Sequence, residues 1–130
     1  MIFKFFTRSL LVTLLALLFV WHGARAQAEG GLQFLSVIED FPLMTGLVES
    51  IDEAMVFETG AGRVVEAQAV GPLNPQDVTS FYRQTLPQLG WATEGQFSYL
   101  RAGERLRLEI SHSLDVTGNT KLVISLSPVK

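Results

Sequence analysis

The sequence predicts an α+β domain in which one helix packs on one face of an antiparallel sheet of about five strands, in the order ββαβββ. Short apolar–polar alternations, typical of strands with one buried face, surround a single stretch with the spacing of an amphipathic helix. An apolar N-terminal segment precedes them. The predicted organisation is a signal peptide over residues 1–26, a leader and irregular clasp segment over 27–53, and the α+β domain over 54–130.

The first 26 residues have the parts of a secretory signal peptide. Lys4 and Arg8 make a basic start, an apolar run covers residues 10–21, and small side chains allow cleavage after Ala26, with Ala28 as the close variant. The alternative is a retained membrane anchor, but the 12-residue run is shorter than the ~20 apolar residues of a spanning helix. We therefore expect a periplasmic or secreted protein that meets a membrane only before cleavage.

Composition narrows the classes of function. Cleavage after Ala26 leaves 104 of the 130 residues, with 7 basic and 13 acidic side chains and a net charge of −6, which argues against a nucleic-acid partner. The absence of cysteine excludes disulfides, thiolate nucleophiles and thiolate metal sites. Residues 27–77 carry nine carboxylates and one base, whereas residues 78–130 carry six bases and four carboxylates, so the two halves are expected to attract each other within the fold.

Residues 34–53 contain apolar side chains without a sustained period, and Pro42 interrupts them, so this segment is expected to be mostly irregular. Its stretch "IEDFPLM" allows two interpretations. If exposed, Phe41, Leu43 and Met44 form a docking strip for a partner protein beside two acidic residues. If buried, they form a clasp over the sheet, which is the interpretation that we favour.

Residues 54–58 and 63–70 are the predicted strands of a hairpin, because the loop "TGAG" between them supplies two glycines. A helix follows, for which Asn74 is a good N-cap and Pro75 suits the first helical position. Its apolar residues are spaced as a single stripe that faces a core; they are Val78, Phe81, Tyr82, Leu86 and Leu89.

The predicted end of the helix depends on Pro87, which has no backbone N–H and disfavours helical geometry at the residue before it. We expect the regular helix to end or kink near Thr85 or Leu86. Gly90 then supplies the left-handed residue that closes the last turn, and the large ring of Trp91 is expected to be buried as the chain enters the sheet.

Three further antiparallel strands are predicted over residues 96–101, 105–112 and 121–127. The middle strand alternates regularly, with one predicted inward face that carries Leu106, Leu108, Ile110 and His112. One helix cannot cover both faces of a sheet. The second face is therefore expected to meet either water or the segment 34–53.

Three arginines are the candidate ligand-binding residues. Arg105 and Arg107 share the outer face of their strand, and Arg101 lies on the neighbouring strand across a short turn. Guanidinium groups placed in this way can hold the carboxylate or phosphate of a small anionic ligand. The alternative, which we favour, is a solvated sheet face on which nearby glutamates pair with the arginines.

Catalytic and metal-binding groups are scarce in this sequence. His112 is the single histidine after cleavage; Glu109 or Asp115 is a possible orienting partner, but no nucleophile motif accompanies it, so a hydrolase is disfavoured. The sequence also has no calcium-loop or phosphate-loop pattern. We expect a non-enzymatic domain without metal or cofactor that binds a protein or an envelope component, with a small anionic ligand as the alternative.

Two motifs carry a resemblance to known proteins. "IEDFPLMTGL" and the later "FYRQTLPQLGW" together resemble uncharacterised short exported proteins of alphaproteobacteria, over most of the chain behind the signal peptide. The second motif is also similar to the helix end of small periplasmic or lipoprotein-type domains, although this chain lacks their lipid-bearing cysteine. The resemblance implies export and an α+β architecture, and it implies no catalytic residue.

Overall fold

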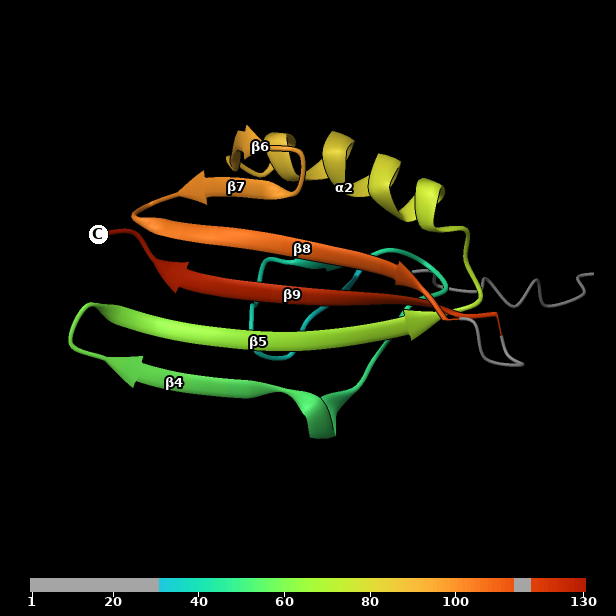
Figure 1. Cartoon of the computed structure of the whole chain (residues 1–130), viewed down its shortest axis with the longest axis horizontal. Helices are drawn as coiled ribbons and strands as arrows, with labels where there is room; N and C mark the ends of the chain where they lie inside the picture. Colours follow the sequence, from blue (N-terminus) through green and yellow to red (C-terminus); the bar gives the residue numbers. More distant parts are fainter. Residues whose placement is uncertain (1–30, 114–117) are drawn as a thin grey trace, which may run out of the picture. The chain divides into compact units, whose positions relative to one another are not determined.

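The computed structural model describes residues 31–113 and 118–130, so the predicted signal peptide lies outside the described residues. Gly31–Lys130 form one compact unit, which includes the segment expected to be a clasp. The unit is an α+β domain with one helix and an antiparallel sheet, as the sequence predicts (Figure 1). Within the described residues, no helix combines the length and the apolar character needed to cross a membrane.

The main sheet has seven strands, in the spatial order β3-β5-β9-β8-β7-β6, and β4 pairs with β5 beside this path. In chain order they are β3 (Val48–Glu49), β4 (Met55–Thr59), β5 (Gly62–Gly71), β6 (Ala92–Gly95), β7 (Ser98–Arg101), β8 (Glu104–His112) and β9 (Thr120–Pro128). The helix α2 (Pro75–Gln88) connects β5 to β6. The remaining elements lie in the preceding segment: β1 (Gln33–Phe34), β2 (Pro42–Leu43) and the 3-10 turn η1 (Ile51–Glu53).

The prediction of about five strands was too low, for two reasons. The strand expected over residues 96–101 is β7, and an additional strand, β6, precedes it and forms a hairpin with it, in which Gly95 pairs with Ser98. All four residues of β6 are exposed, so the apolar alternation that reveals a half-buried strand is absent there. The strands β1, β2 and β3 are each two residues long, which is too short for any period to be read.

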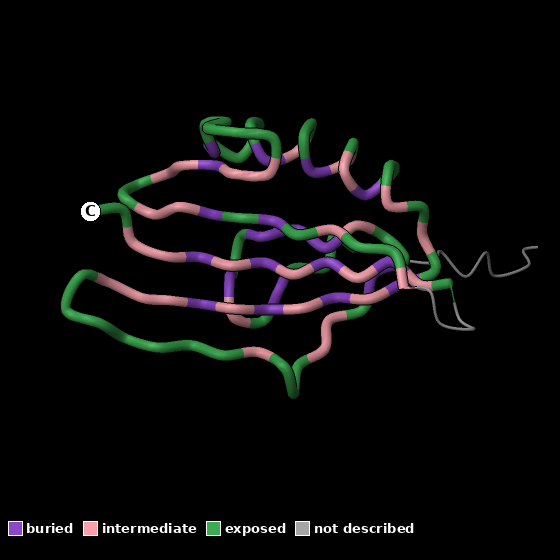
Figure 2. The backbone as a smooth tube through the Cα atoms, viewed as in Figure 1, coloured by how far each residue is buried: buried purple, intermediate pink, exposed green. Residues whose placement is uncertain are grey.

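One face of the sheet, which we call the inner face, is buried. Residues alternate between buried and partly exposed along β5 and β9, and between buried and exposed around Leu106 and Leu108 of β8 (Figure 2). The buried side chains on the three strands are Val65, Ala67, Ala69, Leu106, Leu108, Thr120, Leu122, Ile124 and Leu126. The inward face predicted for β8 is thus confirmed at Leu106 and Leu108, while His112 at its end is exposed.

The helix begins as predicted. Asn74 Oδ1 accepts a hydrogen bond of 2.8 Å from the backbone N–H of Gln76, and Pro75 is the first helical residue. Val78, Tyr82 and Leu86 are buried, which confirms most of the predicted apolar stripe. Leu89, expected on this stripe, is 38% exposed, because it caps the helix beyond the last turn that faces the sheet.

The helix does not end at Thr85 or Leu86, the earlier of the two outcomes that the sequence allows, since it continues through Pro87 to Gln88. Pro87 lies in the last turn, where its missing N–H removes one intrahelical bond without ending the helix. The backbone N–H groups of Leu89 and Gly90 then bond to the carbonyl oxygens of Leu86 and Pro87, at 3.0 and 3.2 Å. Gly90 has a φ of +88°, as a left-handed closing residue requires.

The segment before β4 covers the inner face beside α2, not the opposite face (Figure 1). Leu35, Ile38, Phe41, Leu43 and Leu47 are buried in the same core as the helix. The Tyr82 hydroxyl donates to the carbonyl oxygen of Pro42 at 3.0 Å and accepts the N–H of Met44 at 3.2 Å. Clasp and helix therefore form one layer, and no described segment covers the other face of the sheet, which we call the outer face.

The clasp approaches the sheet most closely where Gly46 meets Gly71, at the end of β5. A Cβ atom at Gly71 would overlap the carbonyl oxygen of Gly46, so only glycine fits at this position. Gly46 itself has a φ of +100°, a conformation that favours glycine. These two glycines allow the irregular segment to lie directly against the strand.

Candidate functional site

The strand β4 is the most exposed long strand of the sheet. All five of its residues are exposed (Figure 2), including Met55 at 46%, Val56 at 49% and Phe57 at 58%. Fully burying a side chain of this kind contributes about 1.5–3 kcal/mol, so three successive exposed ones forgo a substantial stabilisation. Apolar side chains exposed in succession along a strand make β4 a candidate interaction surface.

The backbone of β4 presents free hydrogen-bonding groups to solvent. A two-residue turn joins β4 to β5, so Thr59 and Gly62 form a hydrogen-bonded pair. Hydrogen-bonded and non-hydrogen-bonded pairs alternate along antiparallel strands. Phe57 is therefore bonded to β5, whereas Val56 and Glu58 direct their N–H and C=O groups away from it, and no described strand pairs with this free edge.

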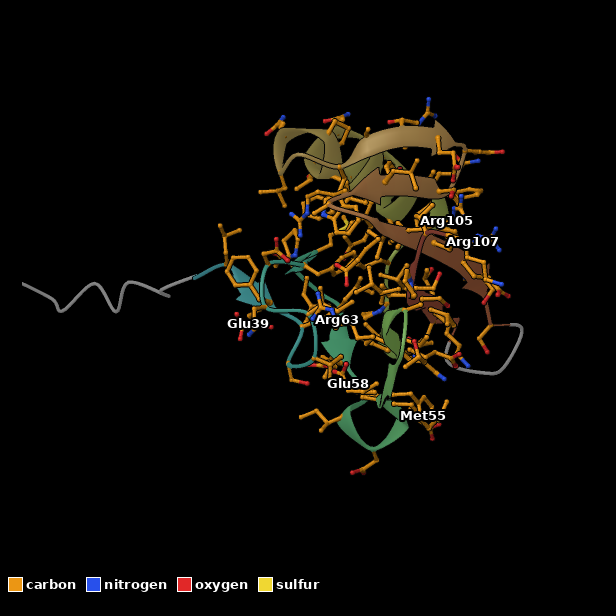
Figure 3. The ribbon with its side chains drawn as sticks, turned by 90° about the vertical axis from the view of Figure 1, so that its left-hand side faces the viewer. Glu39, Met55, Glu58, Arg63, Arg105 and Arg107 are labelled. Atoms are coloured by element: carbon orange, nitrogen blue, oxygen red, sulfur yellow. The ribbon has the colours of Figure 1, made fainter. Side chains whose placement is uncertain are left out.

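The side chains of β4 divide between the two faces of the sheet. Met55 and Phe57 oppose Glu66 and Val64 of β5 and lie on the outer face. Val56 opposes the buried Val65 and lies on the inner face, where the clasp leaves it exposed, and Glu58 opposes Arg63 on the same face. Figure 3 shows Met55 and Glu58 on opposite sides of the sheet.

Two exposed residues that precede β4 extend its apolar surface. Val48 of β3 opposes Val70, which places it on the outer face, and Ile51 projects from η1. Together they complete a surface that we call the β4 edge surface, which consists of Val48, Ile51, Met55, Val56 and Phe57.

The opposite edge of the sheet, formed by β6, has the features that protect an edge from pairing. It is four residues long, and its register shifts between Thr93 and Gly95. Its carboxylate, Glu94, is held by Arg105. The β4 edge has a regular register and three large apolar side chains in succession. Within the described residues, β4 is thus the unprotected edge of this sheet.

Acidic side chains surround the β4 edge surface. Residues 49–62 contain four carboxylates and no base. Glu49 is engaged, because its carboxylate accepts hydrogen bonds from the backbone N–H and the hydroxyl of Ser36, at 3.0 and 2.8 Å. Asp52, Glu53 and Glu58 are exposed, and none of them has an ion pair with a described residue.

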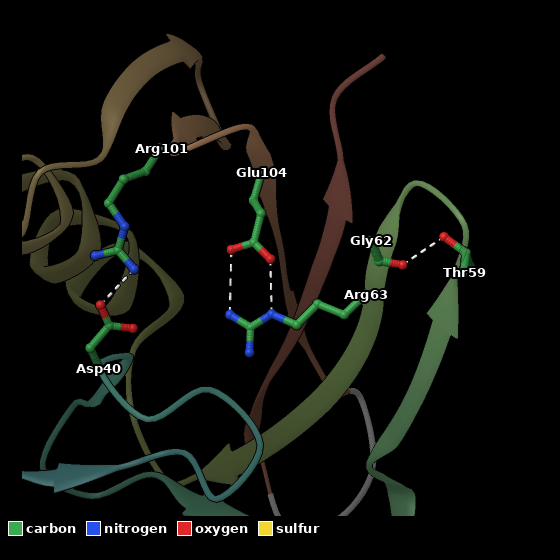
Figure 4. Close-up of polar contacts among 6 residues, drawn as sticks. All are labelled: Asp40, Thr59, Gly62, Arg63, Arg101 and Glu104. Atoms are coloured by element: carbon green, nitrogen blue, oxygen red, sulfur yellow. Dashed lines mark hydrogen bonds and ion pairs between the residues drawn. The ribbon is translucent and has the colours of Figure 1, made fainter.

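The structure does not bring the three candidate arginines together. Arg101 lies on the inner side, where its Nη2 is 2.5 Å from Asp40 Oδ2 (Figure 4), its Nη1 donates to the carbonyl oxygen of Leu89 at 3.0 Å, and its Cζ lies 4.1 Å from the centroid of the Trp91 ring. The pair of Asp40 and Arg101 joins an acid of residues 27–77 to a base of residues 78–130, as the charge distribution along the sequence predicts.

Arg105 and Arg107 lie on the outer face (Figure 3), and the clasp does not reach them. Arg105 binds Glu94 through two hydrogen bonds of 2.9 and 3.0 Å, and these bonds lower the pKa of Glu94 below its ordinary value. Arg107 is exposed and has no ion pair within the described residues. The result is one free guanidinium group, not a cluster of three.

A polar hollow of about 430 Å³ lies between the clasp and the sheet, lined by Ser36, Val37, Glu39, Asp40, Arg63 and Arg101. Arg63 binds Glu104, with its Nε 2.8 Å from Oε1 (Figure 4), and Arg101 binds Asp40. Each cation of this hollow is therefore already paired with a carboxylate, which leaves no free positive charge for an anion.

His112 has no catalytic arrangement around it in the described part of the chain. It pairs with Thr120, whose hydroxyl donates to the carbonyl oxygen of Leu73 and is not free to act as a nucleophile. Glu109 lies on the opposite face of β8, and Asp115 lies outside the described residues. No group of three or more metal-ligating side chains occurs among the residues that were placed.

The predicted docking strip is not a surface. Phe41 is 1% exposed, Leu43 is buried, and Met44 is partly buried against the core. The clasp interpretation of these residues is therefore confirmed, and the docking interpretation was wrong, because their apolar side chains complete the inner layer.

Sequence reasoning did not identify the β4 edge surface. The only local signal is "MVF", three apolar residues without alternation in a predicted strand. The same run fits a strand buried on both faces, so strand order had to be known before it could be interpreted.

No protein-family model, curated protein or solved structure matches this chain. The fold and the site define the protein as a small α+β domain with one open, apolar and acidic sheet edge. The resemblance to short exported proteins stays a prediction.

Proposed function

We propose that this protein is an exported, non-enzymatic binding domain that holds an extended segment of a partner protein along β4. The observation that supports the proposal is the contrast between the two sheet edges: β6 is four residues long with a shift in register, whereas β4 has a regular register and three exposed apolar residues in succession. In strand addition of this kind, backbone hydrogen bonds supply affinity and the alternate side chains supply specificity.

The contacts follow from the alternation along β4. The N–H and C=O groups of Val56 and Glu58 bond to the partner backbone, each bond contributing about 0.5–1.5 kcal/mol net. Met55 and Phe57 are covered on the outer face by the partner's side chains. Export through the predicted signal peptide places this binding in the periplasm or outside the cell, where a protein or an envelope component is the partner.

The alternative, a small anionic ligand held by Arg101, Arg105 and Arg107, receives less support. It assumes that the guanidinium groups of the three arginines converge on one surface. Arg101 and Arg105 are each bound to a carboxylate, and they lie on different faces. We therefore put strand addition first.

The test uses the full-length chain, expressed so that its own N-terminal segment directs export, with the exported product purified. A random-peptide display library is selected on this product. The affinities of the selected peptides are then measured for the wild type and for two variants. Val56→Pro removes an outward N–H, and Val56→Thr keeps both the N–H and the branched side chain. Melting temperatures show that each variant is folded.

We expect the selected peptides to keep their affinity for Val56→Thr and to lose at least about tenfold for Val56→Pro. Glu58→Pro removes the other outward N–H, so its peptide affinity provides the same test if Val56→Pro does not fold. Equal affinity for the wild type and a folded proline variant would exclude strand addition at β4. Failure to select any peptide would also count against the proposal.

A further inference from the structure

We infer that the segment held by β4 is basic as well as apolar: an extended strand of a partner protein that places a lysine or arginine side chain beside Glu58. This inference rests on the proposed strand-addition function. It deepens that function by specifying the chemistry of the occupant.

The charges around β4 carry the first step. Asp52, Glu53 and Glu58 are exposed in and beside the strand, and residues 49–62 contain no base. Arg63, which opposes Glu58 across the ladder, interacts with it electrostatically, but its guanidinium group hydrogen-bonds to Glu104 at 2.8 Å. Glu58 therefore has no ion pair within the described residues, and a strand added at the free edge would bring side chains about 4.5–5.5 Å from it.

The alternation of β4 carries the second step. Met55 and Phe57 point to the outer face, and an added strand covers them best with apolar side chains on that face. Val56 and Glu58 point to the inner side. A lysine or arginine of the added strand matches both residues, because its aliphatic part packs on Val56 and its charged end pairs with Glu58. The segment therefore alternates apolar and basic residues along the five residues of β4.

The same charges argue against a second copy of this chain as the occupant. Antiparallel self-pairing centred on Phe57 would bring the Glu58 side chains of the two copies into diagonal positions about 7–8 Å apart. Each copy would also bring the carboxylates of Asp52 and Glu53, and residues 49–62 contain no base to offset these charges. A basic segment of a different protein removes this repulsion.

The experiment uses three synthetic peptides as probes, titrated into the exported product. One alternates valine and lysine, the second alternates valine and glutamate, and the third is the valine–lysine peptide with methylated backbone nitrogens. The methylated peptide keeps the charge and loses the backbone donors, so it separates strand addition from general ionic attraction. Dissociation constants are measured at low and at high salt.

We expect the valine–lysine peptide to bind about fivefold or more tightly than the valine–glutamate peptide, with a preference that shrinks at high salt. Methylation should abolish binding. Glu58→Gln should reduce the preference and Glu58→Lys should reverse it. Glu109→Gln, which removes an exposed carboxylate from the outer face of β8, should leave the preference unchanged.

The possible failures separate the two proposals. Equal binding of both unmethylated peptides, lost on methylation, would retain strand addition and overturn the basic occupant. Undiminished binding of the methylated peptide, or no binding of any peptide, would overturn both. A concentration-dependent dimer that Val56→Pro abolishes would identify a second copy as the occupant and overturn the inference.

Discussion

The rings of Phe41 and Tyr82 stack with their centroids 5.1 Å apart and their planes inclined by 22°. This contact joins the clasp to the helix. A hydrogen bond from the Tyr82 hydroxyl to the carbonyl oxygen of Pro42, 40 residues away along the chain, joins the same two segments. The inner layer therefore depends on a non-local aromatic pair, and its removal tests whether the clasp belongs to the fold.

Phe41→Ala should lower the free energy of unfolding by about 3–5 kcal/mol, because the ring is buried and its removal leaves a cavity beside Tyr82. Chemical denaturation measures the change. The matched control is Phe57→Ala, which removes an exposed ring from β4 and should cost less than about 1 kcal/mol. A similar loss for both variants would show that β4 serves the stability of the domain and not a partner.

Alkaline pH should destabilise the protein through Tyr82. Burial raises the pKa of Tyr82 from 10.0 to about 12, so the folded state retains the proton that the unfolded state loses. The contribution is complete below pH 10.0 and is lost as the pH rises through about 12, by about 2–3 kcal/mol.

Unfolding free energies measured across this range check the Tyr82 prediction, with Tyr82→Phe as the comparison. The variant should show a shallower decline at alkaline pH, although burial also raises the pKa of Tyr99, so some decline should remain. An unchanged slope in Tyr82→Phe would contradict the assignment.

Arg101→Gln should destabilise the protein by about 1–2 kcal/mol, because it removes the contact with the Trp91 ring, the bond to the Leu89 carbonyl oxygen and the pair with Asp40. Arg107→Gln is the matched control and should change stability by less than about 0.5 kcal/mol. Thermal or chemical unfolding measures both. Equal effects would mean that the inner-face contacts of Arg101 contribute nothing.

Amide hydrogen exchange should distinguish alternate residues of β4 in the unbound protein. The N–H of Phe57 bonds to β5, whereas those of Val56 and Glu58 face solvent, so Val56 and Glu58 should exchange on the order of tenfold faster or more. Residue-resolved NMR measures the rates. Equal protection of Val56 and Phe57 would show that another segment or a second copy already occupies the edge.

Export should remove the N-terminal segment. N-terminal sequencing of the exported product should begin at Gln27, or at Glu29 if cleavage follows Ala28. A product that begins at Met1 and remains in the membrane fraction would show that the segment is an anchor. The localisation prediction would then be wrong, while the β4 edge would remain open to test.

The long elements were predicted closely because each carries its own local signal. β8 and β9 alternate apolar and polar residues, and the structure extends the predicted strands by one residue at the start of β8 and at both ends of β9. The helix start follows from Asn74 and Pro75, whose effects are confined to the first turn. Short exposed strands such as β6 have no such pattern, and their existence depends on their neighbours.

The sequence by itself determined the α+β class, the helix start and the buried face of the long strands, because periodicity and caps act over a few residues. Tertiary structure alone decided which face the clasp covers, that Arg101 is separated from Arg105 and Arg107, and that Val56 faces solvent. The reason is that the position of β4 at the edge of the sheet is set by pairing between distant strands, which no local pattern records.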